Sequence, residues 1–185
     1  MALIRSQWRK LEPVSVSQTD RAIREWLKDL DETEIERGVY VIRFARPYSV
    51  NYPNRPSPVL YIGEGDTLKR LQGHLKNWLR DLSKTMPGVW IDARVTQPRV
   101  QRNAEAYKEV EADLLSYFCE VYGAMPLFNK NKEYFGTSNQ YTRTFLNVLN
   151  PGSGKGYKWA ISPLRSNERQ LKMFKPWRAV EVVAK

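Results

Sequence analysis

Residues 38–45 read Gly-Val-Tyr-Val-Ile-Arg-Phe-Ala, and residues 59–63 read Val-Leu-Tyr-Ile-Gly. Both stretches are rich in β-branched and aromatic residues, which favour strands. The intervening residues 47–58 hold four prolines and two asparagines, so we expect a loop without regular structure. The two stretches therefore predict a hairpin whose neighbouring strands carry Tyr40 and Tyr61.

Periodic apolar residues predict the other elements. Helical spacing predicts helices over residues 18–30, 66–82 and 103–122, and Gly123 ends the last of them. Strict alternation over residues 89–95 predicts a half-buried strand. The order helix, strand, strand, helix, strand, helix indicates an α+β fold, with a small three-stranded β-sheet flanked by α-helices.

The 185 residues suit one domain with extensions. We expect an N-terminal helical extension over residues 1–36, a core over residues 37–135, and a basic, aromatic C-terminal extension over residues 136–185. The net charge of +10 is unevenly spread, because the first part is net −2 and the last is net +7.

The C-terminal extension also interleaves its cations with aromatic residues: Tyr141, Phe145, Tyr157, Trp159, Phe174 and Trp177. Cations among rings suit backbone neutralisation and base stacking together. We therefore expect nucleic acid as the partner. The alternative is a generic basic surface, and some of these rings must belong to the core.

Composition excludes several classes of site. A single cysteine, Cys119, excludes an internal disulfide framework and a cysteine-based zinc cluster. A single histidine, His74, excludes sites that need two histidines. The first four residues run directly into Arg5 without a secretory segment, and no apolar run has membrane-spanning length. We expect an intracellular, cytoplasmic protein with no membrane partner.

Glu111 is the strongest single indication of chemistry. It follows Tyr107 by four residues and precedes Leu114 by three, so it projects from the apolar side of its helix. A buried carboxylate needs a partner because its desolvation is costly. That partner is either a core arginine or a hard divalent cation such as Mg²⁺. The other carboxylates of this helix are expected mostly in solvent: Glu105, Glu109, Asp113 and Glu120.

Arg70 and His74 lie four residues apart on a predicted helix, so both can meet one substrate. A guanidinium beside an imidazole suits a phosphate, because the first stabilises charge and the second accepts or relays a proton. The alternative for His74 is a structural hydrogen-bonding role, and the alternative for Asn77 and Asp81 is a solvated polar stripe.

The ordered combination of these residues resembles the GIY-YIG nuclease family. The family pattern is Gly-x-Tyr, Tyr-Ile-Gly, Arg and His four apart, Glu, and a downstream Asn. This chain meets it in order with Tyr40, Tyr61, Arg70, His74, Glu111 and Asn129. Each tripeptide alone is unspecific, but the ordered set is distinctive. The resemblance covers roughly residues 37–132 and departs in the 20 residues between the two tyrosines, which imply an enlarged hairpin loop.

The resemblance implies a metal-dependent endonuclease that hydrolyses phosphodiester bonds, with DNA as the expected substrate. Glu111 would bind one Mg²⁺, for which Mn²⁺ could substitute. Tyr40 would act as or orient the general base, and His74 would accept or relay its proton. Tyr61 would position water or phosphate, Arg70 would stabilise transition-state charge, and Asn129 would orient the site.

Several alternatives stay open. The substrate could be RNA or single-stranded DNA, and the chain could be a catalytically silent nucleic-acid-binding module. One active site cuts one strand, so double-strand cleavage would need a homodimer or two successive nicks. Restriction, mobile-element homing, repair and defence are all compatible with this core.

Overall fold

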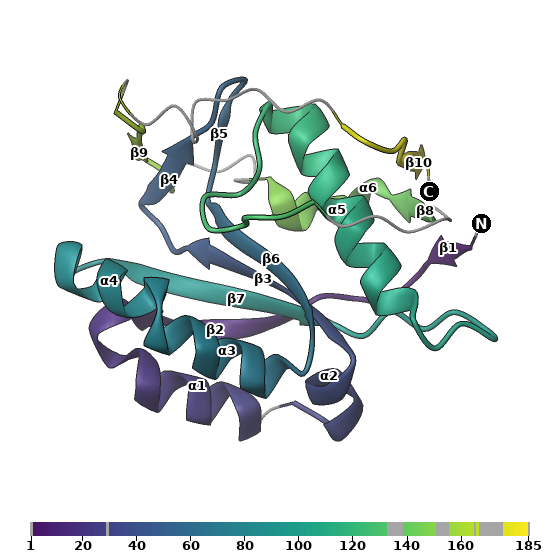
Figure 1. The fold of residues 1–185 in the computed structure, drawn as a ribbon, viewed down its shortest axis with the longest axis horizontal. Helices are drawn as coiled ribbons and strands as arrows, with labels where there is room; N and C mark the ends of the chain where they lie inside the picture. Colours follow the sequence, from purple (N-terminus) through teal and green to yellow (C-terminus); the bar gives the residue numbers. More distant parts are fainter. Residues whose placement is uncertain are drawn as a thin grey trace.

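The computed structural model describes residues 2–28, 30–132, 139–150, 156–164, 166 and 176–184. It is a mixed α+β structure (Figure 1). Its helices are α1 (Thr19–Lys28), α2 (Glu32–Glu36), α3 (Thr67–Lys76), α4 (Trp78–Thr85), α5 (Ala106–Tyr122) and α6 (Arg143–Leu146), with 3₁₀ turns at Val16–Gln18 and Asn147–Leu149. Its strands are β1 (Leu3–Ile4), β2 (Arg9–Ser15), β3 (Gly38–Phe44), β4 (Tyr48–Asn51), β5 (Pro56–Ser57), β6 (Val59–Gly65), β7 (Trp90–Thr96), β8 (Gln140–Thr142), β9 (Trp159–Ile161) and β10 (Glu181–Val183).

The central sheet has four antiparallel strands in the order β2-β7-β3-β6. Strands β3, β6 and β7 lie where the sequence predicted strands, and β3 pairs directly with β6. The predicted three-stranded sheet was one strand too small, because β2 from the N-terminal extension pairs with β7. Strand β2 contains Pro13 and a register shift between Leu11 and Val14, which hide its strand pattern. Proline is tolerated at such an edge position because an edge strand needs fewer ladder bonds.

Helices cover both faces of this sheet. Figure 1 shows α1, α3 and α4 on one side and α5 on the other, where α5 packs over β6 and β3. Side chains alternate along a strand, so Tyr40 and Ile42 face α3 while Val41 and Arg43 face the side of α5. The buried cluster around β3 therefore contains residues from both layers.

The proline-rich segment 47–58 is not wholly irregular, contrary to the prediction. It contains β4 and β5, which pair with each other, and β4 also pairs in parallel with β9. The prolines precede β4, begin β5 or lie between strands, where a missing N–H is tolerated. The partner β9 lies in the C-terminal extension, so local sequence could not indicate this sheet.

The predicted helices are present with different bounds. The segment 66–82 is two helices, α3 and α4, because the backbone at Asn77 (φ −113°, ψ −118°) leaves the helical region. Helix α5 ends at Gly123, whose φ of 79° is the left-handed conformation that glycine adopts without steric cost. The predicted helix 18–30 corresponds to α1, with Ile23 and Trp26 buried.

The C-terminal extension contributes to the core. Strand β8 pairs with both β1 and β10, so both ends of the chain share one small sheet (Figure 1). Tyr141 and Phe145 are buried, whereas Trp159 is 65% exposed. Phe174 lies outside the described residues. The basic, aromatic extension is thus divided between core and surface.

Asp113 corrects one expectation about α5. It was expected in solvent but is fully buried, where it accepts a hydrogen bond from Tyr141 Oη (2.6 Å) and pairs with Arg178 Nε (2.7 Å). Both partners come from the C-terminal extension, so helix periodicity alone could not reveal them. In the described part of the chain, no helix is long and apolar enough to cross a membrane.

Candidate active site

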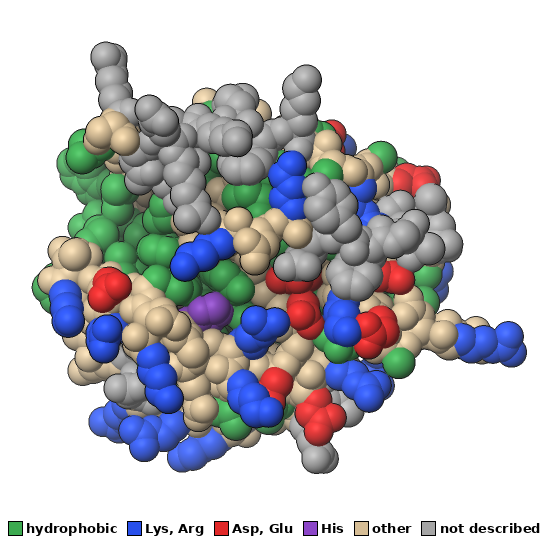
Figure 2. Space-filling model, in the orientation of Figure 1, with side chains coloured by type: hydrophobic (Ala, Val, Ile, Leu, Met, Phe, Trp, Pro, Cys, Tyr) green, Lys and Arg blue, Asp and Glu red, His purple; other side chains and the backbone are tan. Residues whose placement is uncertain are grey.

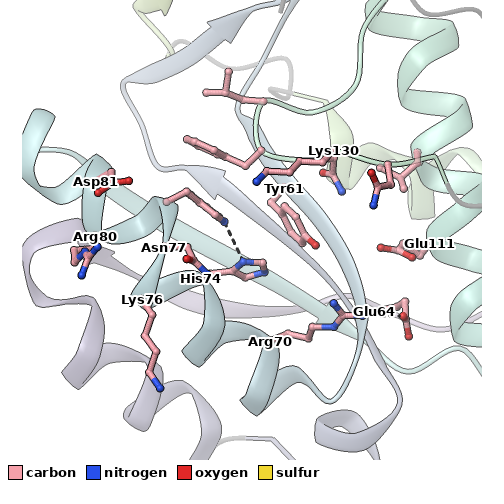
Figure 3. Close-up of a pocket in the computed structure, with 16 residues that line it drawn as sticks. Tyr61, Glu64, Arg70, His74, Lys76, Asn77, Arg80, Asp81, Glu111 and Lys130 are labelled. Carbon is pink, nitrogen blue, oxygen red and sulfur yellow. Dashed lines mark hydrogen bonds and ion pairs between the residues drawn. The ribbon is translucent and has the colours of Figure 1, made fainter. Parts of the chain in front are cut away.

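Five of the six predicted site residues line one cavity of about 930 Å³ (Figure 3). They are Tyr61, Arg70, His74, Glu111 and Asn129. The sixth, Tyr40, is fully buried beside them and hydrogen-bonded to His74. The cavity lies between α3 and α4 on one side and α5 with the segment 127–131 on the other.

Local sequence explains how α3 presents Arg70 and His74. The helix begins at Thr67 because Asp66 Oδ1 accepts a hydrogen bond from Lys69 N (2.9 Å), as expected for an N-cap residue. His74 follows Arg70 at the fourth position, which places both on the helix face that borders the cavity. The strand residue Tyr40 reaches this face from β3.

Steric crowding explains why glycine occurs at positions 38 and 63, in the Gly-Val-Tyr and Tyr-Ile-Gly motifs. A Cβ on Gly63 would lie 2.6 Å from Tyr40 Oη and 2.6 Å from Tyr61 Cε1. A Cβ on Gly38 would overlap the Glu34 carbonyl oxygen. Glycine at position 63 therefore gives the two tyrosine rings their space, and their centroids lie 6.0 Å apart.

Tyr40, His74 and Trp78 form a hydrogen-bonded chain. Tyr40 Oη lies 2.9 Å from His74 Nε2, and Trp78 Nε1 donates to His74 Nδ1 at 3.0 Å (Figure 3, dashed line for the second bond). The ring of Trp78 stacks on Phe128 with 4.0 Å between centroids. The imidazole is consequently held at both nitrogens.

These contacts determine the tautomer of His74. An indole N–H can only donate, so Nδ1 must be the unprotonated nitrogen. Burial and, less strongly, the charge of Arg70 lower the pKa of His74 to about 4, so the ring is neutral at pH 7. A neutral ring with unprotonated Nδ1 carries its hydrogen on Nε2. His74 therefore donates to Tyr40 Oη, and in this state no free ring nitrogen faces Tyr40 to accept a proton.

Both tyrosines are harder to ionise than usual. Burial, followed by the Tyr61 phenol, raises the pKa of Tyr40 well above its ordinary value. Burial raises the pKa of Tyr61 to about 12, and Glu111 adds to this effect while Arg70 opposes it. The two phenols are therefore protonated at neutral pH, and Tyr40 would act as a base only with added positive charge nearby.

Arg70 and two carboxylates surround the tyrosine pair. Arg70 Nη2 lies 3.5 Å from Glu64 Oε1, and about half of the Arg70 side chain is exposed. Glu111 reaches the cavity from α5 and is 8% exposed, as its place on the apolar helix side predicted. Both carboxylates raise the pKa of Tyr61, so the anionic and cationic groups act on the same phenol.

Asn129 acts through the backbone of β6. Its Oδ1 accepts a hydrogen bond from Ile62 N (2.9 Å), and its Nδ2 donates to Ile62 O (2.8 Å). Ile62 directly follows Tyr61, so the amide of Asn129 fixes the strand beside the tyrosine. This contact fits the orienting role that the resemblance implies.

The carboxylates suit a magnesium ion. Magnesium in phosphate-processing sites is held by one or two carboxylates together with phosphate oxygens and water. Glu111 and Glu64 offer this donor set beside Tyr61. Among the described residues there is no group of three or more His, Cys, Asp or Glu side chains arranged to hold a metal. A metal here would therefore depend on few protein ligands.

Sequence reasoning missed three kinds of residue at the cavity. Glu64 directly follows the second glycine motif and was not considered. Trp78 was not considered for the site, although it follows His74 at the same four-position spacing that relates His74 to Arg70. The cavity is also lined by cations that were not singled out: Lys76, Arg80 and Lys130.

No family model matches the chain, and comparisons with curated proteins and with solved structures likewise found no match. The geometry of the site itself therefore carries the functional argument.

Proposed function

We propose that the protein is a metal-dependent endonuclease of the GIY-YIG type that hydrolyses phosphodiester bonds in DNA. The observation that carries this proposal is the convergence of the six motif residues. Five line one cavity and the sixth is hydrogen-bonded to one of them, although they come from separate segments of the chain. Packing alone does not require an arginine, a histidine, a tyrosine and a buried carboxylate at one open cavity.

The charge around the cavity supports a phosphate-containing substrate. Figure 2 shows the single histidine among several lysine and arginine side chains. Arg70, Lys76, Arg80 and Lys130 all line the cavity. Cations at this density attract a nucleic-acid backbone, and such contacts make the affinity dependent on salt.

Glu111 would hold Mg²⁺ or Mn²⁺, with Glu64 as a second carboxylate, and the cation would neutralise charge on the scissile phosphate and the leaving oxygen. Arg70, which is partly exposed to the cavity, stabilises the charge that develops on the phosphate oxygens. Asn129 keeps Tyr61 in place through the backbone of β6.

Tyr40 and His74 would manage the proton of the attacking water. Positive charge in the cavity lowers the raised pKa of Tyr40. The Tyr40 phenol then loses its proton to solvent, and the resulting phenolate accepts the proton of the attacking water, while His74 Nε2–H stabilises the phenolate by donating a hydrogen bond to it. This assigns His74 the role of hydrogen-bond donor in place of proton acceptor.

A cleavage assay with a matched pair of variants tests the proposal. Plasmid, linear duplex, single-stranded DNA and RNA are incubated with Mg²⁺ and the wild-type protein, Glu111→Gln or Glu120→Gln. Glu120 lies on the same helix but is exposed and outside the cavity. We expect Glu111→Gln to reduce DNA cleavage by at least about 100-fold while binding persists, and Glu120→Gln to cleave normally.

Three other outcomes of this cleavage assay would change or reject the proposal. Cleavage of RNA or single-stranded DNA alone would replace the substrate class. Binding by the wild-type protein without cleavage in Mg²⁺ or Mn²⁺ would indicate a silent binding module. Normal cleavage by Glu111→Gln would reject the metal assignment.

A further inference from the structure

A second basic cavity lies on the sheet, away from the candidate active site. On β7, Trp90, Asp92 and Arg94 alternate with the core residues Ile91 and Ala93, so they project from the face opposite Tyr40. Helix α5 packs over β6 and β3 on this face. The part over β7 and β2 holds a cavity of about 440 Å³.

Among the described residues, four cations and one carboxylate line this cavity, which we call the sheet-face site. The cations are Lys10, Arg43, Arg46 and Arg94, and the carboxylate is Asp92. Glu12 also acts on Asp92 but does not line the cavity. The site therefore keeps a net positive charge that is suited to an anionic ligand.

Arg43 is the central group of the sheet-face site. It is 7% exposed, and its Nη2 donates to Tyr157 Oη at 3.2 Å. Its buried Nε has no hydrogen-bond partner among the described residues. A buried guanidinium is costly unless its donors are satisfied, so an acceptor in this cavity would stabilise it.

The carboxylate of Asp92 does not form a hydrogen bond with the neighbouring Arg94 guanidinium. Arg94 Nε lies 3.7 Å from Asp92 Oδ1, which is too long for a hydrogen bond, and Asp92 Oδ1 has no other partner in the described residues. Burial is the largest influence on this pair, since it raises the pKa of Asp92 and lowers that of Arg94. The one carboxylate therefore leaves Arg94 Nε without a hydrogen bond, and the other lining cations, Lys10, Arg43 and Arg46, outnumber it.

Aromatic side chains accompany these cations. Trp90 lines the cavity and is 51% exposed, which is unusual for a large apolar ring. The ring of Tyr157 lies 5.8 Å from the Arg46 guanidinium. An exposed ring beside phosphate-binding cations is the combination that holds unpaired nucleotides, because bases stack on the ring while the backbone meets the charge.

We propose that the sheet-face site binds an unpaired nucleic-acid strand, with a phosphate at Arg43 and Arg94 and a base stacked on Trp90. The inference rests on the proposed function in that it assumes a nucleic-acid substrate. It adds a substrate class, namely a nucleic acid with a single-stranded segment held apart from the cleavage cavity. A duplex fits less well, because its bases are stacked internally and leave none for Trp90.

The test is binding of a fluorescein-labelled oligothymidylate, with EDTA present to prevent cleavage. Trp90→Leu removes the ring at a half-exposed position, so the fold should be retained. We expect its affinity to fall by roughly 5- to 100-fold, the range for loss of one base–aromatic stack. Trp159→Leu is the comparison, because Trp159 is also exposed but does not line the cavity, so the sheet-face site predicts normal binding. A loss equal to that of Trp90→Leu would assign the stacking to exposed aromatic residues in general and overturn the sheet-face site.

The charged groups are tested by salt dependence. Arg43→Gln and, at an exposed position, Lys10→Gln should each reduce the slope of log affinity against log salt by about 0.7 for every phosphate that the variant no longer neutralises. If Arg43→Gln fails to fold, Trp90→Leu and Lys10→Gln decide the question.

The outcomes separate this inference from the proposed nuclease activity. Normal oligothymidylate binding by the Trp90 and Lys10 variants would overturn the sheet-face site, even if the wild-type protein cuts duplex DNA. Trp90-dependent binding without any cleavage would support the site and reject the nuclease. Binding of inorganic phosphate alone, without oligothymidylate, would overturn the nucleic-acid assignment.

Discussion

Replacing Trp78 with phenylalanine tests the hydrogen-bonded chain at the candidate active site. The substitution removes the indole N–H that donates to His74 Nδ1 but keeps an aromatic ring against Phe128. His74 is the only histidine of the chain, so ¹⁵N-histidine labelling reports on one ring alone. Long-range ¹H–¹⁵N correlation spectra distinguish protonated from unprotonated ring nitrogens, and a pH titration gives the pKa.

The expected magnitude follows from the surroundings of His74. A pKa lowered from 6.5 to about 4 corresponds to about 3 kcal/mol in favour of the neutral ring. Burial and Arg70 supply this effect, and both remain in Trp78→Phe. The lost hydrogen bond to the neutral ring contributes about 1 kcal/mol, so the pKa should rise by roughly 0.7.

The wild-type titration also predicts a stability change. The folded protein binds a proton at His74 less tightly than the unfolded chain does, so stability falls as the pH drops from 6.5 towards 4. The loss should approach about 3 kcal/mol and be measurable by urea unfolding.

A matched control separates this effect from the general loss of an indole. Trp26→Phe removes a similar hydrogen bond, to the Glu12 carbonyl oxygen at 2.9 Å, without contacting His74. It should leave the His74 titration unchanged. The reasoning fails if wild-type Nδ1 is the protonated nitrogen, if the wild-type pKa is near 6.5, or if Trp78→Phe leaves both pKa and tautomer unchanged.

Three further variants address the other groups. Tyr40→Phe should lower the Mg²⁺-dependent cleavage rate at every pH with little change in melting temperature. The wild-type cleavage rate should rise above neutral pH, because the raised pKa of Tyr40 leaves little phenolate at pH 7. A Tyr40→Phe protein with the wild-type pH profile would assign the general base to another group. Asn129→Asp replaces the donor to Ile62 O with a carboxylate oxygen and should cost about 1–3 kcal/mol in urea unfolding, more than Asn129→Ser if carboxylate–carbonyl repulsion contributes. Asp113→Asn leaves Arg178 buried without its counter-charge and should cost about 3–5 kcal/mol by the same measurement; an unchanged midpoint would show that the pair contributes nothing.

The sequence predicted elements whose signals are local. The β-rich stretches around Tyr40 and Tyr61 are paired strands in the structure, as predicted. The burial of Glu111, predicted from its place on the apolar side of α5, is also confirmed. Gly123 ended its helix because a left-handed residue is needed there.

The elements that escaped prediction depend on distant partners. Strand β2 is defined by pairing with β7, and β4 by pairing with β9. Asp113 is buried because Tyr141 and Arg178 return to it from the C-terminal extension. At the candidate site, the spacing of Arg70 and His74 was informative, but the proton position on His74 required the Trp78 contact.

The double hydrogen bond of Asn129 has a consequence for the solution behaviour of the protein. Among the strands that the structure describes, β6 is an outer strand of the central sheet, and an outer strand offers unpaired N–H and C=O groups to other molecules. Asn129 occupies both groups of Ile62, and Phe128 N donates to Leu60 O at 3.0 Å. A short stretch of irregular chain thus takes the place that a strand from another copy would fill. The residues beside the candidate catalytic cavity therefore also protect this edge against intermolecular β-pairing and aggregation.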